Sequence, residues 1–190
     1  MLTCFDVADY FKTLIDEESG DLMTNLKLQK LVYYAQGFYL ALHEEPLFNE
    51  EIEAWTHGPV IPELYHYYKD HGSNGIPKPD NFDLSIYPDH VRDLLNDIYD
   101  VYGKYSAWKL RDMTHEEEPW KNNYQKGDSI IPHEDMKNYF KTLLISKAEG
   151  RAERNMEIAK TMFAKGCSID LISQVTELSS EDIKCILGRS

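Results

Sequence analysis

Histidine and acidic side chains are the residues of this 190-residue chain most able to do catalysis or bind a metal. His115 and Glu118 lie three positions apart, and His66 and Asp70 lie four apart, so each pair can share one helix face. A catalytic metal needs three protein ligands and an open position, and no HExxH run supplies them. Serine-hydrolase, P-loop and dinucleotide motifs are also absent from the sequence. The sequence therefore predicts no metal, no cofactor and no enzyme. A hydrolase around His57, His115 and Glu118 is kept as an alternative.

The cysteines and the apolar runs indicate where such a chain resides. Cys4, Cys167 and Cys185 are odd in number and far apart, which predicts neither a disulfide framework nor a thiolate metal site. No run of eighteen apolar residues occurs, and the N-terminus carries Asp6 and Asp9 instead of a basic region before an apolar one. We therefore expect a cytoplasmic protein with no membrane partner.

Charge is distributed unevenly along the chain. Residues 1–146 hold 13 Lys+Arg and 26 Asp+Glu, a balance of −13, whereas residues 147–190 hold seven of each. The acidic part disfavours nucleic acid and anionic membranes, because basic side chains supply most of that affinity. A basic protein partner suits it better, and solubility alone is the simpler explanation. With 42% hydrophobic and 12% aromatic residues, the chain should fold.

Helical periodicity dominates residues 1–146 and predicts a mainly α domain with at most a small β element. Thr3 followed by Asp6 has the spacing of a capping box, which predicts a helix from about residue 4. Residues 28–42 are apolar nearly all round, including Leu42 on the inward stripe, so they should form the central buried helix. Further helices are expected after Pro62, between Pro88 and Gly103, after Ser106 and after Pro132.

The remaining segments of this part carry weaker patterns. Residues 46–55 suit one or two short strands or an extended loop, and a short strand is expected at 82–86. Gly58-Pro59 predicts a turn. Thr114, with Glu117 three residues on, reads as a helix cap, and Pro119 should limit that helix to about one turn.

Residues 147–190 predict a small module of three helices with the spacing of a helix-turn-helix. Gly166 should end the first helix, Ser168 should cap the second, and Ser179 should cap the third. The third helix begins with acidic residues at 181–182, where phosphate and base contacts would need basic or amide side chains. We therefore expect a protein-docking or dimerising module, and a DNA-binding regulator that uses this tail is the alternative function.

Three stretches combine aromatics, Gly-Pro pairs and small residues: LQKLVYYAQGFYLAL at 28–42, EAWTHGPVIPELY at 53–65 and THEEEPW at 114–120. Their order and spacing resemble the Panacea domain of antitoxins, which also occurs in GepA-like phage-associated proteins and in SocA-like proteins. The resemblance covers roughly residues 3–145. His57 departs from the pattern, because that position is often aromatic in the family. The tail resembles the C-terminal tail of transposase-related PD-(D/E)XK nucleases, although no nuclease core precedes it.

The Panacea resemblance implies a non-enzymatic antitoxin. Such a protein neutralises, by direct contact, a protein toxin encoded by a neighbouring gene. One relative, the SocA antitoxin, acts instead as a proteolytic adaptor, which would add a protease as partner. The sequence does not choose between these modes, and homo-oligomers are compatible with both.

Two groups of site residues follow from the motifs. The helix at 28–42 and its approach offer a flank that a partner segment could pack against, formed by Lys27, Lys30, Tyr34, Gly37 and Phe38. A Gly inside a helix costs on the order of 1 kcal/mol relative to Ala and often indicates a close approach. The other family-motif positions are interpreted as structural anchors: Trp55, Gly58, Pro59, Tyr65, Thr114, His115, Pro119 and Trp120.

Overall fold

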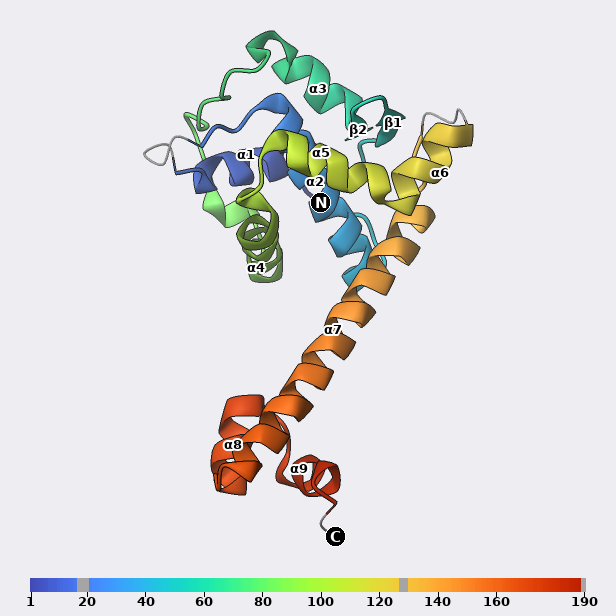
Figure 1. The fold of residues 1–190 in the computed structure, drawn as a ribbon. Coiled ribbons are helices and arrows are strands. Elements are labelled where there is room, and N and C mark those ends of the chain that lie inside the picture. The colour runs from blue at the N-terminus through green and yellow to red at the C-terminus, as the bar shows by residue number, and fades with distance from the viewer. Residues whose placement is uncertain (17–20, 127–129, 189–190) are drawn as a thin grey trace. The chain divides into compact units, whose positions relative to one another are not determined.

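The computed structural model describes residues 1–16, 21–126 and 130–188 (Figure 1). The fold is mainly α, with one two-stranded antiparallel sheet, as the sequence predicted. The chain divides into two compact units, residues 1–141 (unit 1) and 142–190 (unit 2). The boundary expected at residue 146 lies inside a helix that runs from His133 to Ala164.

The elements of unit 1 follow one another closely along the chain. Its helices are α1 (Cys4–Leu14), α2 (Asn25–His43), α3 (Pro62–Tyr68), α4 (Asp89–Ile98), α5 (Ala107–Glu116), α6 (Glu118–Lys126) and the start of α7 (His133–Ala164). A β-hairpin of β1 (Glu53–Trp55) and β2 (Gly58–Val60) lies between α2 and α3. Short 3-10 turns follow at Lys69–His71 and Leu84–Ile86, and a π-helical turn, Tyr99–Gly103, extends α4.

Helix α2 forms the centre of unit 1. It contacts α1, α3, α4, α5 and the strand β2, and Figure 1 shows it running through the middle of this part of the chain. Most of its apolar side chains, together with Val7, Phe11, Leu64 and Leu95, are buried. The predicted central helix is therefore confirmed, except that Leu42 is 52% exposed. Leu42 lies in the last turn, beyond the elements that cover the rest of the stripe.

Most predicted helix starts are confirmed by their caps. Thr3 and Asp6 form the capping box of α1, and Thr24 caps α2. Pro62 occupies the first turn of α3, and the Ser106 side chain accepts from the backbone N–H of Lys109 at the start of α5. These starts depend on contacts within three residues, which explains why the sequence predicts them well.

The predictions of a turn at Gly58-Pro59, a strand at 82–86 and a helix cap at Thr114 are wrong. The hairpin turns at residues 56–57, and Gly58-Pro59 belong to β2, because Trp55 pairs with Gly58. Residues 82–86 form no strand, since the Asp83 side chain accepts from the N–H of Ser85 and closes a 3-10 turn. Thr114 lies inside α5, where its hydroxyl donates to the carbonyl of Arg111.

Pro119 does not restrict its helix to one turn. It lies in the first turn of α6, which continues to Lys126. At that position the missing proline N–H has no partner in the helix in any case, so the ring costs little.

Unit 2 contains the C-terminal part of α7, α8 (Ile169–Thr176) and α9 (Ser180–Ile186). Ser168 and Ser179 cap α8 and α9, as predicted. The first tail helix has no start of its own, because α7 is continuous for 32 residues and ends before Gly166, whose φ is +83°. The core is small: Ala159, Ile172 and Ile183 are fully buried, and Met162, Phe163 and Leu187 pack against them. None of the described helices is long and apolar enough to cross a membrane.

Candidate functional site

Two polar side chains of α2 hold the β-hairpin against the centre of unit 1. The ammonium of Lys30, which is fully buried, donates to the carbonyl of Pro59 at 2.8 Å. From the adjacent position on α2, the Gln29 side-chain carbonyl oxygen accepts from the N–H of Ile61 at 2.8 Å. Both contacts satisfy backbone groups that the short strand cannot pair itself, so they fix the hairpin's position on α2.

Gly58 is required by the close packing at this hairpin. Its φ is +95°, a conformation that side chains disfavour. A Cβ at this position would lie 2.7 Å from the Thr114 hydroxyl oxygen and 2.8 Å from the Lys30 ammonium nitrogen. The Gly-Pro pair of the family motif therefore lies where β2, α2 and α5 meet.

Glu117, between α5 and α6, is the acidic centre of the same buried region. Its carboxylate accepts from the hydroxyls of Tyr33 at 3.0 Å and Tyr34 at 2.8 Å. Burial raises the pKa of Glu117 to about 7, although both hydrogen bonds and the charge of Lys30 oppose the shift. Burial likewise lowers the pKa of Lys30 to about 7, against the attraction of Glu117. We call Lys30, Tyr33, Tyr34 and Glu117 the buried polar network.

Stacked rings lead from this region towards the surface. The ring of His115 stacks on Trp120 with centroids 3.9 Å apart, and Trp120 stacks on Tyr124 at 4.7 Å. The indole N–H of Trp120 donates to the carbonyl of Trp55 at 2.8 Å. Trp55 then meets Tyr65 edge to face at 5.1 Å. The motif aromatics therefore connect the hairpin with α3, α5 and α6.

These rings support an open groove of about 900 Å³, which we call the aromatic groove. Its lining includes Trp55, His57, Tyr65, Lys69, Trp108 and Tyr124. Trp108 is 61% exposed and Tyr124 is 42% exposed, whereas an apolar side chain of this size is usually covered. None of the sixteen lining residues is acidic.

The residues predicted to bind a partner lie mostly inside the protein. Lys27 is 2% exposed, Lys30 and Tyr34 are fully covered, and Gly37 is buried beneath the ring of Phe140. Only Phe38 is half-buried. The flank that was expected to be open to a partner is therefore part of the core, because α5 and α7 cover it. The sequence pattern of an apolar helix interrupted by lysines does not distinguish an open flank from one with buried lysines.

The structural motif residues are distributed between the core and the groove. Gly58, Pro59, Thr114, Pro119 and Trp120 are buried, and Trp55, Tyr65 and His115 are half-buried.

The three residues of the hydrolase alternative make separate contacts. His57 is exposed and meets Trp108 edge-on at 6.0 Å, whereas His115 stacks on Trp120. Burial, followed by the positive charges of Arg111 and Lys30, lowers the pKa of His115. Glu118 is exposed at the start of α6. The described residues contain no group of three side chains placed to hold a metal ion.

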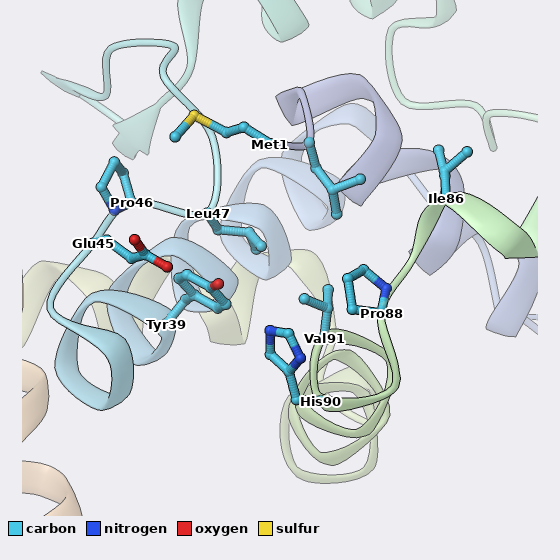
Figure 2. Close-up of a pocket in the computed structure, with 10 residues that line it drawn as sticks. Met1, Tyr39, Glu45, Pro46, Leu47, Ile86, Pro88, His90 and Val91 are labelled. Carbon is cyan, nitrogen blue, oxygen red and sulfur yellow. The ribbon is translucent and has the colours of Figure 1, made fainter.

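A second, smaller cavity of about 540 Å³ lies at the other end of α2. Figure 2 shows Tyr39, Glu45 and His90 lining it, beside Pro88 and the N-terminal Met1. The rings of Tyr39 and His90 are 6.2 Å apart. This cavity uses none of the motif residues, so it is the weaker candidate for a family-related site.

Trp108 and Tyr124 lie outside the three family-motif stretches of the sequence. Both are expected to be apolar core residues by type, and only their spacing could have indicated otherwise. Trp108 lies two positions before Leu110, which places it on the opposite face of α5 from that buried side chain. A large aromatic on a solvent face was therefore the available signal.

Comparison with known proteins agrees with the resemblance in the sequence. Residues 28–121 match the family described as "Antitoxin SocA-like, Panacea domain", and residues 152–187 match "Rpn/YhgA-like nuclease family, C-terminal HTH domain". The protein "Antitoxin SocA" of Caulobacter vibrioides (strain NA1000 / CB15N) is 43% identical over 54 residues, 28% of this chain and 29% of that protein. The chain therefore spans less than a third of that relative. No solved structure shows significant similarity to the chain.

These matches confirm the predicted resemblance of unit 1 to the Panacea antitoxins and of the tail to a helix-turn-helix module. The Panacea match includes the whole buried polar network and both the hairpin and α5. It ends at residue 121, just after Trp120.

Proposed function

We propose that the protein is an antitoxin that neutralises a protein toxin by direct contact through unit 1. The observation that carries this proposal is that the Panacea match at residues 28–121 includes the hairpin, α3 and α5, which supply most of the aromatic side chains of the groove. The buried polar network holds these elements in place, and the groove exposes large aromatics to a partner. Such side chains supply much of the binding energy at protein interfaces.

The proposal includes a non-enzymatic mode of action in the cytoplasm. The motif histidines are occupied in ring contacts, and the groove lining combines aromatics with His57 and Lys69 but no carboxylate. Direct inhibition is the simpler mode. Delivery of the toxin to a protease is the second mode that the family resemblance implies, and it would use the same contact with the toxin.

Co-expression tests the proposal. The full-length chain should restore growth to cells that express the product of the neighbouring gene, and the two proteins should co-purify. Repeating the test in protease-deficient hosts separates the two modes. Direct inhibition should still restore growth there, whereas delivery of the toxin to the deleted protease should not. A folded full-length protein that neither rescues growth nor binds the neighbouring product would refute the antitoxin assignment.

A second candidate function is transcriptional regulation through unit 2. The helix-turn-helix match at residues 152–187 favours it, whereas the acidic start of α9 at Glu181 and Asp182 disfavours phosphate contact. We expect the full-length protein to show no salt-sensitive binding to the DNA upstream of its own gene. Nanomolar binding at physiological salt that charge reversal of Lys184 abolishes would support the regulator instead.

A further inference from the structure

We propose that the aromatic groove is the anchor site for a short apolar segment, flanked by basic residues, of a net-basic protein partner. This inference rests on the proposed function, because it assigns the surface with which an antitoxin would hold its toxin. The groove rather than the predicted flank of α2 takes this role, since the flank is buried and the groove is open.

The composition of the groove favours a protein partner. Unit 1 carries 26 Asp+Glu and 13 Lys+Arg, yet no acidic residue lines the groove. The centres of protein interfaces are depleted in charged residues and enriched in Trp and Tyr. Trp55, Tyr65, Trp108 and Tyr124 come from the hairpin, α3, α5 and α6, so the aromatic surface was assembled by the fold rather than left over from one amphipathic helix.

The floor and the rim of the groove require different chemistry from the occupant. At the floor, the Asn25 amide donates to the carbonyl of Tyr65, and the Gln29 amide donates to the side-chain oxygen of Asn25, each at 3.2 Å. These two buried amides are therefore engaged within the protein, which leaves the floor suited to an apolar side chain.

The rim retains free donors. The Trp108 indole N–H and the Tyr65 and Tyr124 hydroxyls make no hydrogen bond within the described part of the chain. They can donate to the backbone carbonyls of an extended or looped segment. A segment with one large apolar side chain and accessible carbonyls satisfies both the floor and the rim.

The net charge of unit 1 determines the sign of the net charge expected of the partner. A balance of −13 around a groove whose lining includes Lys69 but no carboxylate attracts a basic protein from a distance and repels an acidic one. The binding rate should therefore fall as salt rises, while the apolar contact in the groove determines how long the complex lasts.

Random peptides displayed on phage and selected against the purified full-length chain provide a probe that does not depend on the toxin. Selected peptides should carry a large apolar residue flanked by Lys or Arg. Trp108→Ala should weaken their binding by about thirtyfold, and Tyr124→Ala by about tenfold. Trp108→Phe should keep most of the affinity, because it preserves an aromatic face.

Tyr67→Ala is the matched control. Tyr67 is 68% exposed on α3 but does not line the groove, so its removal should change the affinity by less than about twofold. Circular dichroism melts check that each variant is folded. Selected peptides that are acidic, or that bind Trp108→Ala as tightly as the unaltered chain, would overturn the assignment, as would the absence of any enriched peptide.

The product of the neighbouring gene separates the two proposals. If it binds the unaltered chain and Trp108→Ala equally well, the groove is wrongly assigned although the antitoxin function holds. If the peptides behave as expected but the neighbouring product does not bind, the groove holds and the antitoxin function fails. Loss of both growth rescue and peptide binding in Trp108→Ala supports both proposals.

Discussion

Unit 1 and unit 2 are held together in different ways. In unit 1, side chains of α2 bind groups that are distant in sequence: Lys30 reaches Pro59, and Tyr34 reaches Glu117. In unit 2, the three fully buried residues belong to α7, α8 and α9, and serine side chains within three positions cap the starts of α8 and α9. Unit 1 therefore depends on a few long-range polar contacts in a low-dielectric interior, and unit 2 on local caps and a small apolar cluster.

Their surfaces differ as well. Unit 1 carries all of the net charge of −13, whereas residues 147–190 are balanced. The aromatic groove lies in the acidic unit, whereas two exposed apolar side chains of the charge-balanced unit 2, Leu171 and Val175, lie together on α8. A charged surface and a polar interior therefore occur in the same unit, the one that matches the antitoxins.

Replacing the buried lysine should have the largest effect on stability. Lys30→Met removes the donor to Pro59 and leaves Glu117 without the nearby positive charge, so we expect a loss of about 3 kcal/mol. Lys160→Met, on an exposed position in unit 2, should change stability by less than about 0.5 kcal/mol. Urea unfolding followed by far-ultraviolet circular dichroism measures both, because both units are helical. Equal losses of stability in the two variants would show that the contact between Lys30 and Pro59 does not stabilise unit 1.

The acidic centre of the buried polar network should give stability a pH dependence. Folding raises the pKa of Glu117 from 4.5 to about 7, so the folded state binds more protons than the unfolded state between these values. This contribution is complete below about pH 4.5 and is lost as pH rises through about 7, with a change on the order of 2 kcal/mol. Glu117→Gln should remove that decline in urea melts at pH 5 and pH 7. The lowered pKa of Lys30 acts above about pH 7, where it makes stability rise with pH.

Two helical glycines should respond to alanine with opposite signs. A Cβ on Gly37 would overlap the ring of Phe140, so Gly37→Ala should destabilise unit 1 by about 2 kcal/mol. Nothing lies within 4 Å of a Cβ on Gly150, in the part of α7 that belongs to unit 2. Gly150→Ala should therefore stabilise its helix by about 1 kcal/mol. Thermal melts of both variants measure the two changes in stability, and changes of the same sign would contradict this prediction.

The caps of unit 2 should give the smallest effects. Ser168 accepts from the N–H of Leu171 and Ser179 from the N–H of Asp182, so each change to Ala should cost about 1 kcal/mol. Amide hydrogen exchange should show faster exchange in α8 or α9, with α2 unchanged. Faster exchange in α2 as well would mean that the two units do not unfold separately.

Local structure was largely predictable because its causes are local. The capping box at Thr3, the serine caps at 106, 168 and 179, and the proline start at 62 each depend on neighbours within one helical turn. The mainly α class and the buried central helix followed from periodicity. The predictions that failed, such as a cap at Thr114 and a strand at 82–86, concern residues whose partners could be chosen in more than one way.

The candidate site was predicted only in part. The order of the motif residues identifies them, but the sequence pattern favours an open flank at Lys27 and Lys30, and no motif includes Trp108 or Tyr124. A lysine inside an apolar helix can either point into solvent or be buried beside a carbonyl or carboxylate partner. Likewise, an aromatic side chain on α5 can either pack in the core or line a groove at the surface.

The sequence by itself determined the helices, their caps, the acidic charge of unit 1 and the resemblance to the antitoxins, since these properties depend on composition and on neighbours along the chain. Only the tertiary structure decided that Lys30 lies beneath Pro59, that Glu117 binds two tyrosines, and that four aromatics from separate elements form one groove. The physical reason is that burial and pairing depend on which elements meet. Contacts between residues far apart along the chain, such as Tyr33 with Glu117 across 84 positions, set that arrangement.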